Sequence, residues 1–312
     1  MIYLITGGAG FIGSHVVRNL LDRGEKVRIL DNFATGKREH LVPLEGRVEV
    51  IEGDIRYLNN VQEAVAGADY VIHLAALPSV ARSVRTPIES NDTNVHGTLN
   101  VLIAARDAKV KRVVYAASSS AYGNSATLPK VETMPSDPLS PYAVNKLAGE
   151  LYCRVFTRVY GLETVSLRYF NVFGPRQDPS SQYSAVIPRF IQSLLADQRP
   201  RIFGDGEHSR DFTYVQNAVE ASLLACTAPG VAGETINVAC GERVTLNRLV
   251  KLICANLGKD LAPIYDEPRA GDVLHSQADI RKAQTLLRYQ PAVGMEEGVK
   301  RTIEWLRGDG AA

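Results

Sequence analysis

The segment Thr6–Gly13, of sequence TGGAGFIG, joins an apolar run at Ile2–Ile5 to an amphipathic stretch at Ile12–Arg23. A strand that turns through glycines into a helix points the free N–H groups and positive dipole end of that helix at the turn. Glycines permit the tight turn, close approach of a ligand phosphate and packing of the helix on the strand. The pattern predicts a diphosphate-binding βα unit, although a purely structural turn has the same glycines.

Short apolar runs alternate with amphipathic segments through the first half of the chain. This alternation predicts a parallel sheet covered by helices on both faces, the doubly wound α/β class with a Rossmann sheet. The predicted strands are Ile2–Ile5, Val27–Leu30, Val48–Glu52, Tyr70–His73, Val113–Ala116 and Thr164–Arg168. The predicted helices are Ile12–Arg23, Leu58–Val65, Asn94–Ala108 and Tyr142–Tyr160.

The pattern becomes less regular after Asn171, where proline and glycine are frequent. We expect residues 1–170 to form the nucleotide-binding domain and residues 171–312 mainly a smaller, mixed α/β substrate domain. Helices are predicted at Ile187–Ala196 and Asn247–Asn256. Segments within residues 212–240, namely Asn217–Cys226 and the strand-like Glu234–Val238, are expected to return to the first domain.

The composition is that of an ordinary globular protein, with 45% apolar and 22% charged residues in a chain of 312. A net charge of +1 gives no reason to expect nucleic acid or a membrane surface as partner. No apolar run reaches the roughly 18 residues of a membrane span. The four cysteines form no CxxC pair and the six histidines have no zinc-type spacing, so we expect reduced thiols, a cytosolic protein and no metal.

Two carboxylates follow predicted strands where a nucleotide would lie. Asp31 ends the second strand, eighteen residues past Gly13, where a carboxylate can accept hydrogen bonds from adenosine ribose hydroxyls. An acid there repels a 2′-phosphate, which favours NAD over NADP. Asp54 follows the third strand and is a candidate for the adenine end, although a helix cap or turn role explains it equally well.

A third group of residues has the composition of an acid–base site. Ser118 follows the strand Val113–Ala116, and Tyr142 and Lys146 lie four residues apart, on one face of a predicted helix. An ammonium beside a phenol favours the phenolate, as would an oxidised nicotinamide ring, so we expect the pKa of Tyr142 to be lowered. Tyr142 then serves as a base, with Ser118 relaying or positioning the proton. The YxxxK spacing alone is common on helix surfaces. Together with the glycine turn and the serine at the end of a parallel strand, it favours a catalytic role.

Eight segments, in order, extend these patterns into a resemblance that runs nearly end to end. The chain resembles the extended short-chain dehydrogenases/reductases, specifically their nucleotide-sugar epimerase branch. The segments are TGGAGFIGS (Thr6–Ser14), LDNF (Leu30–Phe33), GDI (Gly53–Ile55), HLAAL (His73–Leu77), SSSAYG (Ser118–Gly123), SPYAVNK (Ser140–Lys146), LRYFNVFGP (Leu167–Pro175) and SRDFTYV (Ser209–Val215).

The resemblance implies NAD as cofactor and assigns residues to each part of it. Tyr142 is the base, Ser118 its partner, and Lys146 bridges to the nicotinamide ribose. The other implied cofactor residues are Gly7, Gly10, Phe11, Ile12 and Gly13 at the phosphates, Asp31 and Asn32 at the ribose, Asp54 and Ile55 at the adenine, and Leu74, Ala75, Ala76, Asn94 and Tyr169 along the rest of the groove.

The resemblance also implies a UDP-sugar as substrate. Arg210 and Arg269 would grip its diphosphate, because a guanidinium matches phosphate oxygens in a fork. The implied substrate contacts further include Ser79, Ser118, Tyr142, Asn171, Ala185, Val186, Phe203, Asp272 and Ser276, with uracil between Ala185, Val186 and Phe203 and the nucleotide ribose on Asp272. The uridine is implied by the resemblance alone.

In this family the first step oxidises carbon 4 of the sugar to a ketone, with NAD as oxidant, and later steps differ. Relatives that dehydrate or decarboxylate carry a carboxylate just after the catalytic serine, where this chain has Ser119 and Ser120. The sequence therefore favours simple 4-epimerisation through a transient 4-keto sugar. The alternatives are a UDP-glucuronate decarboxylase, a nucleotide-sugar 4,6-dehydratase, or a non-catalytic nucleotide-binding regulator.

The choice of hexose depends on Ser276, where some relatives carry a bulky tyrosine. A small residue leaves room for an N-acetyl group, so we expect both plain UDP-glucose/UDP-galactose and their N-acetylated counterparts to be substrates. Pro78, beside Ser79, departs from the glycine or lysine of relatives and weakens that expectation.

Relatives commonly form homodimers through two helices per subunit, which here correspond to Asn94–Ala108 and Tyr142–Tyr160. Leu147, Leu151 and Val155 form an apolar stripe on the second helix, which suits either a dimer interface or core packing.

Overall fold

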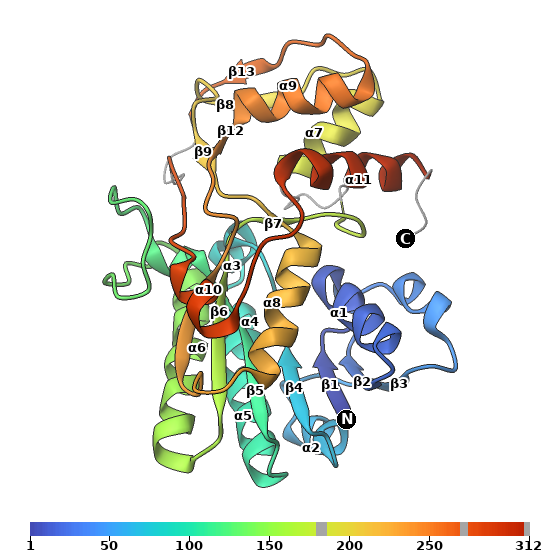
Figure 1. Cartoon of the computed structure of the whole chain (residues 1–312), viewed down its shortest axis with the longest axis vertical. Helices are drawn as coiled ribbons and strands as arrows, with labels where there is room; N and C mark the ends of the chain where they lie inside the picture. Colours follow the sequence, from blue (N-terminus) through green and yellow to red (C-terminus); the bar gives the residue numbers. More distant parts are fainter. Residues whose placement is uncertain (179–185, 269–273, 309–312) are drawn as a thin grey trace.

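The computed structural model describes residues 1–178, 186–268 and 274–308. A twisted sheet with helices on both faces forms the lower part of the molecule, and a helical layer with short strand pairs lies above it (Figure 1). The sheet has seven parallel strands in the order β11-β6-β5-β4-β1-β2-β3. Their bounds are β1 Ile2–Thr6, β2 Lys26–Asp31, β3 Glu49–Glu52, β4 Tyr70–His73, β5 Arg112–Ser118, β6 Thr164–Tyr169 and β11 Glu234–Val238.

Alternate residues of the central strands face opposite sides of the sheet. Leu4 of β1 packs with one buried cluster and Ile5 with another, as the period of two in a strand requires. Helices α1 (Phe11–Asp22) and α8 (Val215–Thr227) cover the Ile5 side. The Leu4 side is covered by α2 (Leu58–Val65), α5 (Gly97–Asp107) and α6 (Pro141–Tyr160).

The carboxyl ends of four neighbouring strands meet at one edge of the sheet. Thr6 pairs with His73 across β1 and β4, and Ser118 pairs with Tyr169 across β5 and β6. Parallel pairing brings strand ends of the same polarity together, so loops from distant parts of the sequence converge there. This edge faces the upper layer in Figure 1.

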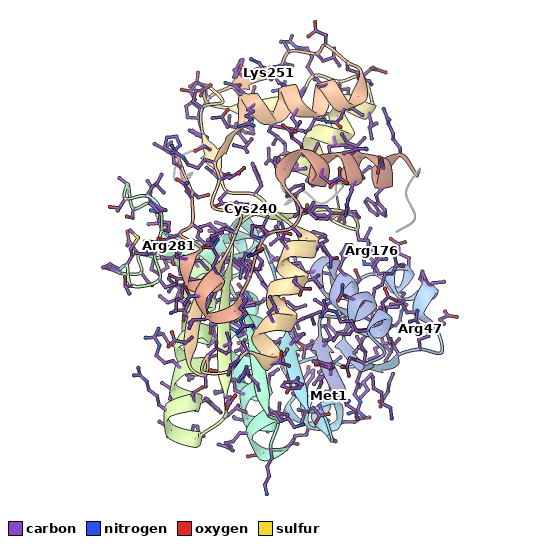
Figure 2. All side chains as sticks on the ribbon, in the orientation of Figure 1. Met1, Arg47, Arg176, Cys240, Lys251 and Arg281 are labelled. Atoms are coloured by element: carbon purple, nitrogen blue, oxygen red, sulfur yellow. The ribbon has the colours of Figure 1, made fainter. Side chains whose placement is uncertain are left out.

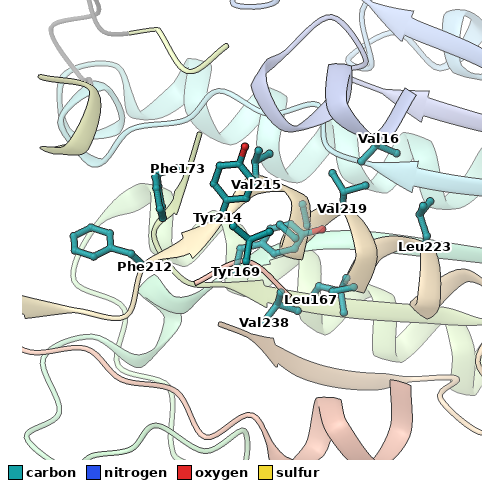
Figure 3. Close-up of a cluster of buried hydrophobic side chains, with 14 of the residues drawn as sticks. Val16, Leu167, Tyr169, Phe173, Phe212, Tyr214, Val215, Val219, Leu223 and Val238 are labelled. Atoms are coloured by element: carbon teal, nitrogen blue, oxygen red, sulfur yellow. The ribbon is translucent and has the colours of Figure 1, made fainter. Parts of the chain in front are cut away.

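Among the described residues, three helices and three strand pairs form the upper layer. The helices are α7 Val186–Leu195, α9 Leu246–Leu257 and α11 Met295–Arg307. The pairs are β7 (Val172–Phe173) with β10 (Thr213–Tyr214), β8 (Arg201–Phe203) with β13 (Ile264–Asp266), and β9 (Ser209–Arg210) with β12 (Val244–Thr245). The buried cluster that contains Ile5 runs from the sheet into this layer, through Tyr169, Phe173 and Tyr214 (Figure 3).

Helix α8 and strand β11 lie against the sheet although they follow the first part of the upper layer in the sequence. Strand β11 pairs with β6, and α8 packs on α1. At the lower end of the sheet, Arg112 donates hydrogen bonds to the carbonyls of Ala225, Cys226 and Ala228 and to the carboxylate of Glu163. These bonds fix the end of α8 to β5. The division of the chain near residue 170 stays a prediction about its folding units.

The strands and long helices predicted from the sequence are present, with small shifts at their ends. The predicted helix Asn94–Ala108 is preceded by a π-helical turn, Asp92–His96, before α5 begins at Gly97. Sequence patterns did not predict the short helices α3 Val80–Arg85, α4 Pro87–Asn91 and α10 Arg281–Leu287, the C-terminal helix α11, or the two- and three-residue strands.

Two further features concern the cysteines and the helices. The four cysteines are all free thiols, and Cys240 lies at the level between the sheet and the upper layer (Figure 2). Within the described residues, no helix combines the length and apolar character needed to cross a membrane.

Candidate active site

A cavity of about 350 Å³ lies along the carboxyl edge of the sheet. Most of the residues predicted for the cofactor line it. They are Gly7, Gly10, Phe11, Ile12, Gly13, Asp31, Asn32, Asp54, Ile55, Leu74, Ala75, Ala76, Tyr142, Lys146 and Tyr169. Ser118, predicted for catalysis, and Asn171, predicted to contact the substrate, also line it. Residues that sequence patterns missed also line it, among them Thr35, Gly36, Arg56, Glu89 and Thr93. Their signal was absent because they come from irregular loops and from short helices without a strong period.

The glycine turn brings the backbone of three segments closer together than side chains would allow. Gly7 has a φ of +74°, and a Cβ there would lie 2.8 Å from the backbone nitrogen of Ala75. A Cβ on Gly13 would collide with the carbonyl oxygen of Gly7. The first bond of α1 runs from the N–H of Ser14 to Gly10, at 3.0 Å, so the N–H groups of residues 11–13 point out of the helix end.

Asp31 is buried at the end of β2 and braces the glycine turn. Its carboxylate accepts hydrogen bonds from the backbone N–H of Ala9 at 2.9 Å and of Phe33 at 2.8 Å. Burial raises the pKa of Asp31, while these two N–H groups act in the opposite direction. Asp31 therefore shapes the turn as well as lining the cavity.

Asp54 is linked to two neighbours at the same end of the cavity. It accepts a hydrogen bond from Asn32 at 2.8 Å and forms an ion pair with Arg56 at 2.7 Å. Burial would raise the pKa of Asp54, but the Arg56 guanidinium and the Asn32 amide outweigh it and lower that pKa. The Asn100 amide donates to the carbonyls of Ile55 and Arg56, which fixes the backbone of this loop.

Ser118, Tyr142 and Lys146 converge at the other end of the cavity. Ser140 caps α6 by accepting from the N–H of Ala143 at 3.2 Å, which starts the helix one residue before Tyr142. The Tyr142 hydroxyl is hydrogen-bonded to Ser118. One turn further along α6, the buried Lys146 ammonium donates to the carbonyl of Ala116 at 2.8 Å.

The prediction that Lys146 lowers the pKa of Tyr142 is wrong. Burial raises the pKa of Tyr142 to about 12, although the hydrogen bond with Ser118 acts against this rise. Burial also lowers the pKa of Lys146 to about 8, so its charge is itself disfavoured. The spacing on the helix was predicted correctly, but burial disfavours the charged form of each group and sets the direction of both pKa shifts.

The prediction that Asn94 lines the cofactor cavity is also wrong. Asn94 is 1% exposed, and its side chain accepts from the N–H of Leu77 at 2.8 Å and donates to the carbonyl of Leu77 at 3.0 Å. It lies in the π-helical turn, and the neighbouring Thr93 faces the cavity instead. Asn94 thus holds the loop that lines the groove.

A second cavity, of about 290 Å³, lies in the upper layer and shares Asn171 and Val172 with the first. The predicted residues Val186, Phe203 and Arg210 line it. So do Arg189, Arg201 and His208, which sequence patterns missed because they come from three separate segments. Arg201 is paired with Asp266 at 2.7 Å. Several cationic groups around an apolar pocket suit an anionic ligand with a flat apolar end.

Asn171 lies at the junction of the two cavities in a strained conformation, with a φ of +38°. Its amide donates to the carbonyl of Asp211 at 2.9 Å and to the hydroxyl of Ser276 at 3.3 Å. Strain of this kind persists where the surroundings fix it, often at functional sites. Ser276 is thereby held beside the junction, although it does not line either cavity.

Ser79 lies apart from both cavities. With a φ of +97°, it caps α3 by accepting from the N–H of Arg82 at 3.1 Å, while its neighbour Pro78 lines the first cavity. The predicted Ala185, Arg269 and Asp272 lie outside the described residues.

A buried carboxylate fixes the loops around this junction. Asp211 is 0% exposed and accepts hydrogen bonds from the N–H groups of Cys240 at 3.0 Å, Gly241 at 3.0 Å and Ala278 at 3.1 Å. Burial raises its pKa to about 6, against the effect of those N–H groups. Asp211 therefore connects the strand that carries Arg210 to the segment that carries Ser276.

The arrangement offers a long groove with a helix N-terminus, an acid–base pair near its end and an adjoining cationic pocket. Groups of three or more histidine, cysteine or acidic side chains that could hold a metal do not occur in the described parts of the chain.

Comparisons with known proteins agree with this geometry. The model of the "NAD dependent epimerase/dehydratase family" matches residues 3–239. The UDP-N-acetylglucosamine 4-epimerase from Methanobrevibacter ruminantium M1, solved with UDP-N-acetylmuramic acid, is 40% identical, with a TM-score of 0.94 and 98% of each chain covered. The UDP-glucose 4-epimerase of Thermus thermophilus, solved with NAD, is 36% identical, with a TM-score of 0.90 and 99% of each chain covered.

Another relative carries a different activity. The UDP-N-acetyl-alpha-D-glucosaminuronate decarboxylase of Bacillus cytotoxicus is 35% identical over 317 residues, which cover 97% of both chains. The match over most of the chain, at these identities, shows that this protein is a member of the NAD-dependent epimerase/dehydratase family of the extended short-chain dehydrogenases/reductases.

Proposed function

We propose that this protein is a UDP-hexose 4-epimerase that works through a transient 4-keto sugar. The observation that carries the proposal is the junction at Asn171, where a groove ending in Ser118, Tyr142 and Lys146 meets a cationic pocket. A nucleotide sugar with its diphosphate near Arg210 would present its sugar to Tyr142.

The first cavity fits NAD. The outward N–H groups of residues 11–13 suit a pyrophosphate, and the collisions that a Cβ would make at Gly7 and Gly13 indicate a backbone cradle without room for side chains. Asp31 lines the cavity at the end of β2, where its carboxylate would repel a 2′-phosphate, which favours NAD over NADP. When bound, NAD supplies the redox chemistry at carbon 4 and a positive charge beside the phenol.

The chain's own residues then perform the acid–base work. Tyr142 takes the proton of the sugar 4-hydroxyl and later returns it, and Ser118 is hydrogen-bonded to that phenol to hold it in place. Lys146, anchored on Ala116, presents its ammonium from the next turn of the helix. A pKa near 12 leaves too little phenolate at neutral pH, so a positive charge in the groove is needed to make Tyr142 an effective base.

Absence of a carboxylate after the catalytic serine favours epimerisation over the decarboxylation of the Bacillus relative. The short helix that follows Ser118 begins with Ser119 and Ser120, and Ser120 donates its hydroxyl proton to Ser118 at 2.8 Å. Neither residue can act as a carboxylate acid or base.

We propose that plain and N-acetylated UDP-hexoses are both substrates, because Ser276 is small and lies beside the junction through its bond to Asn171. A methyl-sized difference changes specificity only by on the order of 10–200-fold, so dual use is physically reasonable.

We also propose a cytosolic homodimer. Leu151 and Val155 of α6 are 47% and 46% exposed, and Val144 and Val159 extend the apolar face along the same helix. Leu147, the third residue of the predicted stripe, is half-buried. The exposure of the other side chains supports an interface, since a second copy of the same face would bury them.

The test is to incubate the purified protein, without added NAD, with UDP-glucose and with UDP-N-acetylglucosamine, and to follow the anomeric protons by NMR. Galacto-configured product shows a 4-epimerase that retains its cofactor, and the two rates measure sugar preference. If neither sugar yields galacto product after NAD is added, the proposal is wrong. Carbon dioxide from UDP-glucuronate would then indicate a decarboxylase, and a 4-keto-6-deoxy product a dehydratase.

A further inference from the structure

A chain of buried hydrogen bonds runs behind the cofactor groove, from the end of β1 to the π-helical turn. The N–H of Ala75 donates to the Thr6 hydroxyl at 3.2 Å, and that hydroxyl lies 2.7 Å from Nδ1 of His73. On the other side of the ring, Nε2 of His73 lies 3.0 Å from the hydroxyl of Thr98. The Thr98 hydroxyl donates to the carbonyl of Asn94 at 2.7 Å.

The Asn94 end of this chain places a proton on Nε2 of His73. Thr98 has one hydroxyl proton and gives it to the Asn94 carbonyl, so it must accept from His73, which requires a proton on Nε2. On a neutral ring, Nδ1 then carries no proton and accepts from the Thr6 hydroxyl, which itself accepts from the N–H of Ala75. The chain of hydrogen bonds therefore suits the neutral Nε2–H tautomer of His73.

Burial agrees with a neutral ring. His73 is 1% exposed, and burial, with a further effect of the Lys146 charge, lowers its pKa to about 3. The ring also lies 5.7 Å from that of Tyr115, which the Lys146 ammonium approaches to 5.0 Å. The Tyr115 hydroxyl, which also contacts Thr98, donates its proton to the Lys146 carbonyl at 3.3 Å. A neutral bridge here avoids a second buried positive charge near the catalytic lysine.

The chain holds one end of the loop Leu74–Leu77, and Asn94 holds the other. Ala75 is bonded to Thr6, while the backbone N–H and carbonyl of Leu77 are both bonded to the Asn94 side chain. This loop lines the cofactor cavity and packs against Gly7. We propose that His73 is a positioning residue, a neutral bridge between Thr6 and Thr98 that fixes this loop for NAD binding.

The proposal rests on NAD occupying the first cavity, and its first test measures NAD release from the holoenzyme. Thr6→Val keeps the side-chain shape but removes the acceptor of Ala75 and the donor to His73. The released NAD is quantified by mass spectrometry during dialysis. We expect release to be about 10-fold faster, because one buried N–H and one ring nitrogen lose their partners.

Two variants separate positioning from general stability. Thr164→Val is the matched control: Thr164 is 1% exposed and donates to the carbonyl of Cys153 at 2.8 Å, at the amino end of β6. It should lower the unfolding temperature without changing NAD release. Thr6→Ser keeps the hydroxyl and should restore slow release. Equal NAD release from the two valine variants would overturn the proposal and leave the chain of hydrogen bonds with a structural role only.

A measurement on the unaltered protein covers the case in which Thr6→Val does not fold. The ¹⁵N shifts of the histidine rings in the holoenzyme report tautomer and charge, and His73→Gln identifies the resonance. A neutral Nε2–H ring across pH 5–8 supports the bridge; a charged ring or a proton on Nδ1 contradicts it. Unaltered protein that holds no NAD contradicts the proposed cofactor instead, and the ring measurement distinguishes the two failures.

Discussion

The two cavities that meet at Asn171 are built in different ways. At the glycine turn the cofactor groove is made of backbone, which Asp31 braces from within the groove, and Asn94 holds the neighbouring loop from behind. The pocket above it is made of side chains, including Arg189, Arg201 and Arg210, that come from separate helices and strand pairs. A site made of backbone is determined by local sequence and tolerates little change, whereas a site made of side chains can vary while the fold persists.

The largest effect should come from Tyr142→Phe, which removes the hydroxyl that exchanges the proton with the sugar in our proposal. Turnover should fall about 10³-fold or more, because acid–base catalysis is lost. NAD content and UDP affinity should stay unchanged, measured by mass spectrometry and calorimetry. Retained turnover would show that another group is the base.

Gly13→Ala tests whether the groove is as intolerant as its backbone contacts suggest. The new Cβ would meet the carbonyl of Gly7, so we expect a loss of about 1–3 kcal/mol in the free energy of unfolding, and loss of bound NAD. Gly294→Ala is the control from the upper layer, because Gly294 has nothing within 4 Å of a Cβ and a φ of −77°. Equal denaturation midpoints for the two variants would contradict the expected difference between the crowded Gly13 and the uncrowded Gly294.

Ser276→Tyr tests the opposite expectation, that the upper site changes specificity without losing the fold. The ring should exclude an N-acetyl group, lowering kcat/KM for UDP-N-acetylglucosamine by about 10–200-fold relative to UDP-glucose. The unfolding temperature and NAD content should barely change. If both sugars lose equally, Ser276 does not select the sugar.

The smallest effect concerns Asp211 and pH. Burial raises the pKa of Asp211 from 3.8 to about 6. Between these two pH values the folded state keeps a proton on Asp211 that the unfolded state has released. The stability that this protonation contributes is therefore lost as pH rises from 3.8 to about 6. Asp211→Asn should remove this part of the pH dependence of unfolding. It should also raise KM for the UDP-sugar several-fold, because an amide cannot accept from all three N–H groups, and leave NAD release unchanged. A raised NAD release rate would show that Asp211 acts on both cavities.

Sequence patterns predicted the groove well because its signals are local. The glycine turn, Asp31 at the end of its strand and the Tyr142–Lys146 spacing are each contained within a few residues. The pKa of Tyr142 could not be predicted in the same way, since burial arises from the whole fold. Asn94 was assigned to the groove from its position in the sequence. The direction of its side chain depends on the π-helical turn, which the sequence pattern did not predict.

The pocket in the upper layer was predicted less completely. Arg210 was found through its motif, whereas Arg189 and His208 belong to no motif and reach the pocket only through tertiary packing. The short strand pairs of this layer have two or three residues, too few to show a period of two. Roles assigned to Ala185, Arg269 and Asp272 stay predictions.

The bonds from Arg112 to the end of α8 limit how the protein can move. Helix α8 begins next to β10, in the upper layer, and its far end is held to β5 at the bottom of the sheet by the bonds that Arg112 donates to three carbonyls. A rigid swing of the upper layer away from the sheet would have to bend this helix or break those bonds. In the proposed reaction, entry and rotation of the sugar should therefore depend on loop rearrangement near the mouth of the cavities, with the two layers keeping a fixed mutual orientation.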